Sequence, residues 1–335
     1  MARPCKLVFW GTPQFAVPSL RYLLNADAVE VVGVVTQPDR RRGRGQQISP
    51  SPVKVIAQAA EVPLWQPERV KKDPQTLRAL QNLQADAFVV VAYGQILSPE
   101  ILSMPRLGCI NSHASLLPKY RGAAPIQWAI YHGESQTGVT TMLMDAGMDT
   151  GAMLLRSTWP IGLLDNAQDL AQALAVQSGP LLADTLQQLD QGILEPQPQS
   201  ESLATYAPLL HKPDFCLDWH RPALALHNQV RAFFPNALAT FRHQTIKVLE
   251  TWPLAEDWAD QLPEEGRSLL AALPSAQGKP GEVVQVVKGQ GPIVGTADGY
   301  LLIRGVQLAG KRPQSGWDFA NGSRVGPEDI LTNGG

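Results

Sequence analysis

The first half of the chain alternates short apolar runs with stretches of helical periodicity, and this alternation limits the folds it can adopt. Residues 87–92 (AFVVVA) are apolar at every position, as is typical of a strand that is covered on both faces. Further strands are expected at residues 5–10, 29–36, 109–113, 139–144 and 153–159. Because parallel strands are joined by long crossovers, usually helices, the pattern predicts an α/β domain with a doubly wound, mostly parallel sheet.

Helical patterns lie between or after these runs, at residues 14–25, 51–60, 73–83 and 165–189. Ser51 and Asp73 each stand directly before a proline. This is a usual signature of a helix start, because Ser or Asp caps free backbone N–H groups and proline suits the first helical position. Gly179-Pro180 falls inside the longest pattern. We expect an interruption there, since a proline removes one backbone hydrogen bond.

The composition and hydrophobic pattern of the chain change after residue 190. Residues 191–208 (QGILEPQPQSESLATYAP) are rich in Pro, Gln and Ser with little apolar periodicity, a composition typical of a linker. A helix is expected at residues 222–233, followed by β-type runs at 238–242, 245–249, 282–287, 292–296 and 300–306. Short strands with Gly-rich turns predict a small OB-like β-barrel. The predicted division is therefore 1–190, a linker at 191–208, and 209–335, with residues 252–278 as an acidic surface excursion.

Composition narrows the class of protein. The chain has 335 residues, 44% hydrophobic and 17% charged, which is enough for two globular domains. Its net charge of −2 provides no overall basic field, so a nucleic acid would have to be held by local patches. Cys5, Cys109 and Cys216 form no CxxC pair, which favours a reducing compartment. With neither a signal-like leader nor an apolar run of the roughly 20 residues that a membrane span needs, we expect a cytoplasmic protein.

Asn111, His113 and Asp149 are the candidate catalytic residues. Asn111 and His113 stand two apart in a predicted strand, so they share one face at the strand end, where α/β sheets bind ligands. An Asn N–H can stabilise an oxyanion, His exchanges protons near neutral pH, and a nearby Asp orients the ring. These are the needs of acyl transfer to an amine. A lone Asn-x-His is more often a satisfied polar pair in a loop, so the surrounding sequence decides.

The sequence around these residues resembles the folate-dependent formyltransferases. The matching segments are FWGTPQFA (9–16), TQPDRRRGRG (36–45), VVVAYGQIL (89–97), SLLPKYRGAAPIQWA (115–129) and TGVTTMLMDAGMDTG (137–151), with looser matches in LATYAPLLHKPDFCLDW (203–219) and VRAFFP (230–235). SLLP and DTG are common to relatives that use formyl-tetrahydrofolate. RGAAPIQ and the TQPDR–GRG loop resemble the branch that formylates methionyl initiator tRNA.

The resemblance implies a fold and a set of site residues. It implies a formyltransferase Rossmann-like domain that carries catalysis, followed by an OB-like tRNA-binding domain. Asn111, His113 and Asp149 would be catalytic. The co-substrate would be 10-formyltetrahydrofolate, with no metal, bound by Ser115, Leu116, Leu117, Pro118, Tyr93, Gly94 and Leu97.

A dense basic cluster is formed by Arg40, Arg41, Arg42 and Arg44. In isolation such a cluster is usually a solvated loop, but Arg also pairs with phosphate through two hydrogen bonds. The resemblance implies that these residues, with Lys119 and Arg121, contact tRNA. It thus implies a monomeric enzyme that transfers formyl to methionyl initiator tRNA for translation initiation, without a membrane partner.

Two alternatives stay open at this point. One is a relative with the same donor and another acceptor: a sugar-nucleotide or glycinamide-ribonucleotide formyltransferase, another small-amine enzyme, or a formyl-folate hydrolase. The other is a catalytically idle tRNA-binding protein on the same scaffold, which would be expected to have lost Asn111, His113 or Asp149. Deletion of residues 40–44 would separate a tRNA enzyme from a sugar enzyme.

Overall fold

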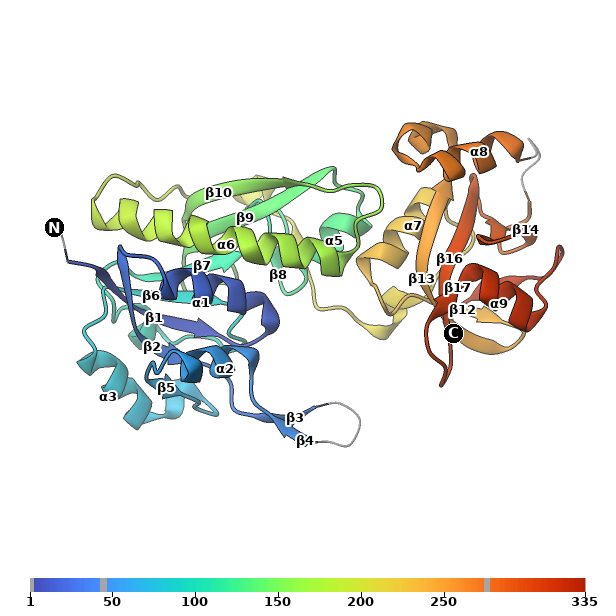
Figure 1. Ribbon diagram of the computed structural model, residues 1–335. Helices are drawn as coiled ribbons and strands as arrows, with labels where there is room; N and C mark the ends of the chain where they lie inside the picture. Colours follow the sequence, from blue (N-terminus) through green and yellow to red (C-terminus); the bar gives the residue numbers. More distant parts are fainter. Residues whose placement is uncertain (1–2, 43–46, 274–277, 335) are drawn as a thin grey trace. The chain divides into compact units, whose positions relative to one another are not determined.

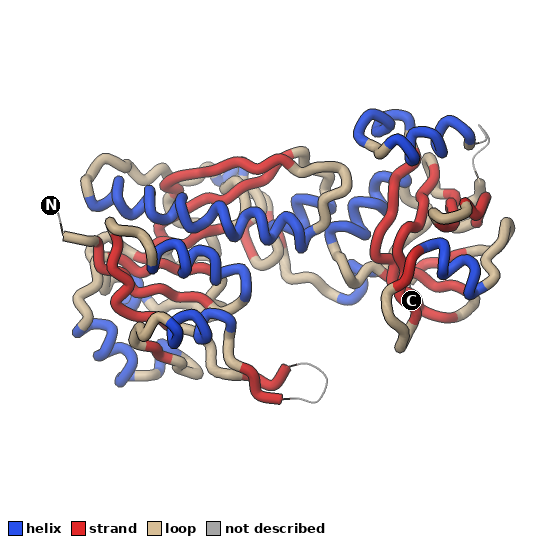
Figure 2. The backbone as a smooth tube through the Cα atoms, in the orientation of Figure 1, coloured by secondary structure: helices blue, strands red, loops and turns tan. Residues whose placement is uncertain are grey.

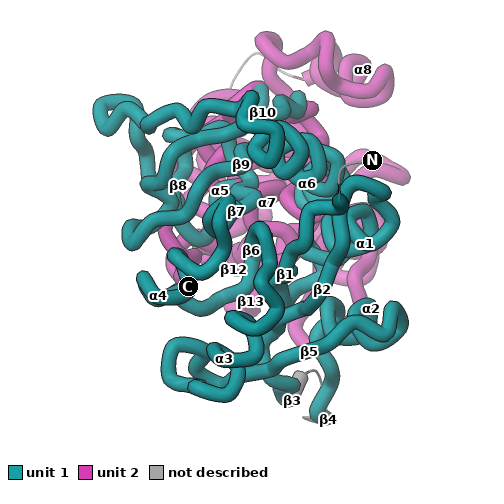
Figure 3. Tube along the Cα trace, turned by 90° about the vertical axis from the view of Figure 1, so that its left-hand side faces the viewer, with its two compact units in different colours: residues 1–125, 136–160, 171–207 teal, residues 126–135, 161–170, 208–335 magenta. Residues whose placement is uncertain are grey.

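The computed structural model describes residues 3–42, 47–273 and 278–334, and the chain forms two compact units (Figure 3). The first unit contains residues 1–125, 136–160 and 171–207. The second contains residues 126–135, 161–170 and 208–335. The division into domains at 1–190 and 209–335 with a linker at 191–208 stays a prediction beside these units.

The first unit is built on a 7-stranded sheet in the order β10-β9-β7-β6-β1-β2-β5. Its strands are β1 Cys5–Gly11, β2 Val29–Val35, β5 Leu64–Trp65, β6 Ala87–Val91, β7 Cys109–His113, β9 Gln136–Leu143 and β10 Met153–Pro160. Neighbours from β7 to β5 are parallel, whereas β9 is antiparallel to both β7 and β10. This confirms the predicted doubly wound, mostly parallel sheet.

Both faces of this sheet are buried, as the apolar strands predict. Along β1, Leu7 and Phe9 pack in one core cluster, whereas Val8 and Trp10 pack in another. The first face is covered by α1 Val17–Leu24, α2 Pro52–Ala59 and α6 Ala167–Asp190 (Figures 1 and 2). The second face is covered by α3 Pro74–Asn82 and α4 Pro99–Leu102, on the other side of the strands (Figure 3). In a sheet covered on both faces, the usual place for a ligand is the crevice at the carboxyl ends of the strands.

The helix starts agree with their capping signals, but one helix is longer than expected. The Ser51 hydroxyl accepts a hydrogen bond from the backbone N–H of Lys54, and the Asp73 carboxylate caps α3 in the same way. The predicted interruption near Pro180 is wrong, because α6 runs through it. Leu182 and Leu186 of α6 are fully buried in the core. Their burial outweighs the cost of about 3 kcal/mol for an interior proline.

Several short elements were not expected from the sequence. The strands β3 Arg40–Arg42 and β4 Gln47–Ser49 pair as a hairpin that extends from the first unit (Figure 1). The strand β8 (Arg121–Gly122) pairs in parallel with β11 (Tyr206–Ala207). One-turn 3₁₀ helices are η1 Gln14–Ala16, η2 Val70–Lys72, η3 Glu201–Leu203 and η4 Lys212–Phe215.

The second unit is an antiparallel sheet in the order β14-β15-β16-β13-β12-β18, with β17 paired to β16. Its strands are β12 Leu238–Phe241, β13 Gln244–Leu254, β14 Val283–Val287, β15 Gly291–Gly295, β16 Tyr300–Leu308, β17 Gln314–Ser315 and β18 Leu331–Asn333. Backbone hydrogen bonds between residues 281–283 and 328–331 join its two edges. The sheet therefore curls into a partly closed barrel, which is consistent with the predicted OB-like domain.

Helices complete the second unit: α5 Pro125–Tyr131, α7 Ala223–Ala232, α8 Glu264–Ala272, α9 Gly316–Ser323 and the 3₁₀ helix η5 Glu256–Gln261. The helix expected at 222–233 is α7. The acidic excursion begins later than predicted, because β13 continues to Leu254 before η5 and α8 follow. Trp219 and Phe319 are at most 1% exposed and fill the core between the barrel and its helices.

His227 makes the stability of the second unit sensitive to acid. The ring is 2% exposed, and its Nε2 donates to the carbonyl of Leu163 at 2.7 Å, so Nδ1 of the neutral ring accepts from Thr251 Oγ1 at 2.9 Å. Burial, and then the charge of Arg231, lower the pKa of His227 to about 3. An unfolded His titrates near pH 6.5, so below that pH the unfolded state binds more protons. The free energy of unfolding is therefore expected to fall from about pH 6.5 towards pH 3, by at most about 1.4 kcal/mol per pH unit.

Urea unfolding between pH 7 and pH 4 measures this effect. The variant His227→Gln should lose less stability on acidification than the wild type, although it starts from a lower value. His220→Gln is the matched control, because the side chain of His220 is 75% exposed. Equal acid dependence in His227→Gln and the wild type would show that His227 titrates normally in the folded state.

Candidate active site

Strand β7 presents Asn111 and His113 on one face of the sheet. The alternate side chains point the other way: Ile110 packs in the cluster covered by α6, and Ser112 Oγ donates to Ser178 Oγ of that helix at 3.1 Å. Asn111 and His113 therefore project from the face opposite α6, at the carboxyl end of a parallel strand. This confirms that the two residues share a face.

Asp149 reaches both of these side chains from the loop between β9 and β10. Its Oδ1 lies 3.4 Å from Nδ2 of Asn111, and its Oδ2 lies 3.7 Å from Nδ1 of His113. The backbone N–H of Gly122 donates to Oδ2 at 2.8 Å. The structure thus brings the three predicted residues together within the first unit.

The hydrogen bond of the His113 ring to Tyr120 fixes the tautomer of the neutral ring. The ring Nε2 lies 2.9 Å from the backbone carbonyl of Tyr120, which can only accept, so Nε2 carries the hydrogen. The lone pair is then on Nδ1, the nitrogen that faces Asp149. Only 7% of the His113 side chain is exposed, against 17% for Asp149. His113 can thus take up a proton at Nδ1 and share the resulting charge with the carboxylate.

An apolar wall lies beside these polar groups. Leu117, Met142 and Met153 form a buried cluster, and Met142 is the strand neighbour of Asn111. Apolar surroundings lower the local dielectric constant and strengthen the interaction of a developing charge with fixed dipoles. The site therefore combines a hydrogen-bond donor, a proton acceptor and a carboxylate where each acts more strongly than in water.

The turn that follows β7 contains the predicted donor-site residues Ser115, Leu116, Leu117 and Pro118. The Ser115 hydroxyl donates to the carbonyl of Lys119 at 2.6 Å. The Thr140 hydroxyl donates to the carbonyl of Ser115 at 2.7 Å and accepts from the backbone N–H of Leu117 at 3.1 Å. Ser115 and Leu117 are fully buried, whereas Leu116 and Pro118 are partly exposed. The turn is thus rigidly held, and these two side chains are available to a ligand.

The loop after β6 offers mainly its backbone. Tyr93 and Leu97 are 2% and 5% exposed and pack in the core, so neither presents its side chain to solvent. Gly94 between them is exposed and has a φ of 88°, which favours glycine. Ile96 is 80% exposed, and Met148 on the β9–β10 loop is 68% exposed. Exposed backbone with bare apolar side chains suits a flat heteroaromatic ligand.

The predicted tRNA contacts differ in their accessibility. Arg40 and Lys119 are exposed. Arg44 lies outside the described residues, and of Arg41 and Arg42 only the backbone in the β3–β4 hairpin is described. Arg121 is 1% exposed, and its guanidinium donates to both carboxylate oxygens of Glu201 at 2.9 and 3.1 Å. A phosphate could reach Arg121 only if these bonds were broken.

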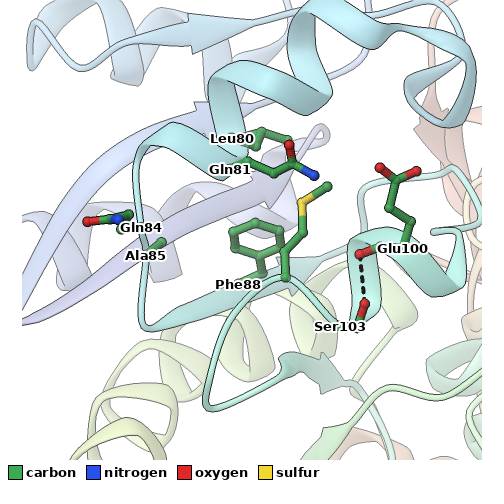
Figure 4. Close-up of a pocket in the computed structure, with 8 residues that line it drawn as sticks. Leu80, Gln81, Gln84, Ala85, Phe88, Glu100 and Ser103 are labelled. Atoms are coloured by element: carbon green, nitrogen blue, oxygen red, sulfur yellow. Dashed lines mark hydrogen bonds between the residues drawn. The ribbon is translucent and has the colours of Figure 1, made fainter.

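A separate pocket of about 270 Å³ lies on the same unit. It is lined by Leu80, Gln81, Gln84, Ala85, Phe88, Glu100, Ser103 and Met104 (Figure 4). Phe88 is the strand neighbour of Cys109, so the pocket lies towards the amino ends of the strands, away from His113. Glu100 is its single acidic or basic residue. The pocket therefore offers no arrangement for proton transfer comparable to the site at β7.

Within the described residues, no group of His, Cys, Asp and Glu side chains could hold a metal ion, and no helix is long and apolar enough to cross a membrane.

Sequence reasoning missed Tyr120 and Gly122, whose backbone groups orient His113 and Asp149. Backbone contacts depend on the path of the chain in three dimensions. No residue type in the sequence marks them.

Comparison with known proteins places the chain in a family. The formyl transferase family matches residues 5–186, and its C-terminal domain family matches residues 209–324. The chain belongs to the formyl transferase family of enzymes. A methionyl-tRNA formyltransferase from Trichormus variabilis is 58% identical over 332 residues, which are 98% of this chain and 99% of the relative. One from Gloeothece citriformis is 59% identical over 324 residues, covering 96% and 97%.

Solved structures share the architecture at lower identity. A sugar 3N-formyl transferase crystallised with dTDP and 5-N-formyl-THF has a TM-score of 0.60 and 18% identity, and the match covers 93% of this chain and all of that one. HypX from Aquifex aeolicus in complex with tetrahydrofolic acid has a TM-score of 0.61 and 16% identity, covering 95% and 47%. At such identities the similarity shows the fold alone.

Proposed function

We propose that the protein transfers the formyl group of 10-formyltetrahydrofolate to the amino group of methionyl initiator tRNA, as a cytoplasmic, monomeric enzyme of translation initiation. The observation that carries the proposal is the convergence of Asn111, His113 and Asp149 at the end of β7. The full-length relatives named methionyl-tRNA formyltransferase support this choice of acceptor.

The loops around β7 fit the formyl donor. The exposed backbone at Gly94 and the exposed side chains of Ile96 and Met148 would hold the pteridine ring. Leu116 and Pro118, on the rigid turn after His113, would lie along the donor near its reactive end. When bound, the donor supplies an activated formyl carbon, and the residues of the chain position it.

The reaction forms one bond and breaks another. The methionyl nitrogen bonds to the formyl carbon, the bond between that carbon and N10 of the folate breaks, and one proton moves from the amine to N10. Asn111 would donate its amide N–H to the oxyanion of the tetrahedral intermediate. Nδ1 of His113 would accept the amine proton and return it to N10, while Asp149 stabilises the charged ring. Catalysis would rest on positioning and electrostatics.

Formyl transfer from labelled donor to charged initiator Met-tRNA tests the proposal. Uncharged tRNA, free methionine and an amino-sugar nucleotide serve as controls. Label on the charged tRNA alone is the expected result. Label on the amino sugar instead would support the proposed formyl donor and contradict the proposed acceptor.

The β3–β4 hairpin is expected to contribute to tRNA affinity. Replacing Arg40, Arg41 and Arg42 by Ser should raise KM for Met-tRNA about tenfold or more and leave donor affinity unchanged. Arginine–phosphate pairs make binding salt-dependent, so the slope of log affinity against log salt should fall by about one for each pair that the replacement removes. Steady-state kinetics at several salt concentrations provide both values.

The control for the hairpin variant carries the same kind of change elsewhere on the first unit. Lys71 and Lys72 are exposed at the end of η2, and replacing both by Ser removes positive charge without touching the hairpin. An equal rise in KM in both variants would show that only overall charge matters, and would contradict a specific role of the hairpin.

A further inference from the structure

A segment far from the catalytic residues in sequence holds the turns that orient them. We call residues 199–207 the strap. It belongs to the first unit, and its strand β11 pairs in parallel with β8, just after the SLLP turn. The strap thus runs beside the backbone that carries the partners of His113 and Asp149.

Gln199 holds the turn at Asp149. Its Nε2 donates to the backbone carbonyls of Asp149 and Gly151, both at 2.8 Å. Asp149 has a φ of 54°, in the left-handed region. For a residue with a side chain this conformation costs on the order of 1–3 kcal/mol, and it persists only where surrounding contacts hold it. The two bonds from Gln199 are such contacts, and they fix the direction of the carboxylate.

Arg121 fixes Gln199 in turn. Its Nε donates to Oε1 of Gln199 at 3.0 Å, so the amide oxygen points to Arg121 and the amide nitrogen to the Asp149 turn. The two terminal nitrogens of Arg121 bind the carboxylate of Glu201. The Arg121 side chain is fully buried whereas that of Glu201 is 72% exposed. A buried guanidinium paired in this way is a rigid support.

Thr205 holds the second turn, which orients His113. Its hydroxyl accepts from the backbone N–H of Tyr120 at 2.9 Å, and its carbonyl accepts from the backbone N–H of Arg121 at 2.9 Å. Tyr120 has a φ of 62°, also left-handed. The carbonyl of Tyr120 is the partner of Nε2 of His113. The strap therefore supports the orientation of the ring as well as that of the carboxylate.

Gly122 connects the strap directly to the carboxylate. Its N–H donates to Oδ2 of Asp149, and a Cβ at this position would lie 2.6 Å from the carbonyl oxygen of Ala207. With a φ of 121°, the position also favours glycine. The backbones of Gly122 and Ala207 are too close to admit a side chain between them, so the strap packs directly against the residue that binds the Asp149 carboxylate.

We infer that the strap is a positioning element for formyl transfer, in which Gln199 positions Asp149 and Thr205 positions His113 through Tyr120. The kinetic part of this inference rests on the proposed function. Gln199 and Thr205 bind the backbone of the turns at Asp149 and Tyr120 and would act through these turns. Their loss is therefore expected to lower turnover and leave substrate affinity in place.

The first test compares Gln199→Leu with Gln197→Leu. Gln197 is exposed and lies outside the strap, so its replacement is a matched control. Gln199→Leu should lower kcat about 10- to 100-fold, because a displacement of about 1 Å at a reacting group can cost 100-fold. KM for Met-tRNA and the dissociation constant of the donor should not change. The pH profile of kcat should shift in Gln199→Leu and stay as in the wild type in Gln197→Leu.

The second test compares Thr205→Val with Thr205→Ser. Valine keeps the shape and removes the hydroxyl that accepts from Tyr120, whereas serine restores it. The ¹⁵N NMR signals of the His113 ring, assigned by their absence in His113→Gln, report its orientation without any substrate. They should move in Thr205→Val and return in Thr205→Ser, and kcat should follow the same order.

The outcomes separate the strap from the proposed function. If the wild-type enzyme does not formylate Met-tRNA but the ring signals still move in Thr205→Val, the proposed function is wrong. The positioning role of the strap would still hold. If the wild type is active, and kcat, the pH profile and the ring signals are the same in Gln199→Leu and Thr205→Val as in the wild type, the positioning role of the strap is wrong. Loss of kcat in Thr205→Ser equal to that in Thr205→Val would also overturn it.

Discussion

Replacing His113 by Gln is expected to lower kcat of formyl transfer by about 10²- to 10⁴-fold, the usual contribution of a general acid–base group. A Gln amide can keep the hydrogen bond that Nε2 makes to the carbonyl of Tyr120, so the turn after β7 is retained. The variant lacks Nδ1, the ring nitrogen that faces Asp149 at 3.7 Å and that would carry the transferred proton.

Steady-state and single-turnover kinetics with saturating donor measure this effect. KM for Met-tRNA and donor affinity should stay near the wild-type values, so that the loss falls on kcat alone. His220→Gln, on the exposed surface of the second unit, should behave as the wild type. Near-normal turnover in either His113→Gln or His113→Asn would refute the role of His113 in proton transfer.

The sequence contains enough local information to predict most of the first sheet. Strands β1 and β6 are apolar at nearly every position, and this pattern is typical of a short strand buried on both faces. The helix starts at Ser51 and Asp73 follow from caps that act within three residues. Such local signals are independent of the rest of the fold.

Sequence-based prediction fails where the local preference of a segment conflicts with its tertiary packing. A proline favours a break in α6, but Leu182 and Leu186 bury the helix against the sheet, and Gly179 allows close contact with Tyr22. Strands of two or three residues, such as β8 and β11, have no periodicity to detect. They exist because distant segments of the first unit lie side by side.

The candidate site also contains features that the sequence predicts and features that depend on tertiary contacts. Asn111 and His113 share a face because strand side chains alternate, which the sequence predicts. Arg121 could not be distinguished by sequence from an exposed phosphate contact, because its partner Glu201 lies 80 residues further along the chain. The support from Gln199 to Asp149 spans 50 residues and leaves no local signature.

Replacing Asn111 by Ala is expected to lower kcat by about 10²- to 10³-fold, the usual cost of removing one oxyanion donor. The side chain occupies the face of β7 beside His113, and its amide nitrogen lies 3.4 Å from Oδ1 of Asp149. If the amide acts only in the transition state, kcat and kcat/KM fall equally. A rise in KM with unchanged kcat would instead show that Asn111 binds the ground state.

Asn111→Asp gives the sharper test, because it keeps the shape of the side chain and reverses its electrostatics. A carboxylate at this position would repel both Asp149 and the oxyanion, so its kcat should fall below that of Asn111→Ala. Asn25→Ala, on the surface near the end of α1, is the control and should be as active as the wild type. If Asn111→Asp were more active than Asn111→Ala, packing rather than hydrogen-bond donation would explain the residue. The order wild type, Asn111→Ala, Asn111→Asp is therefore the result that assigns the oxyanion to the amide of Asn111.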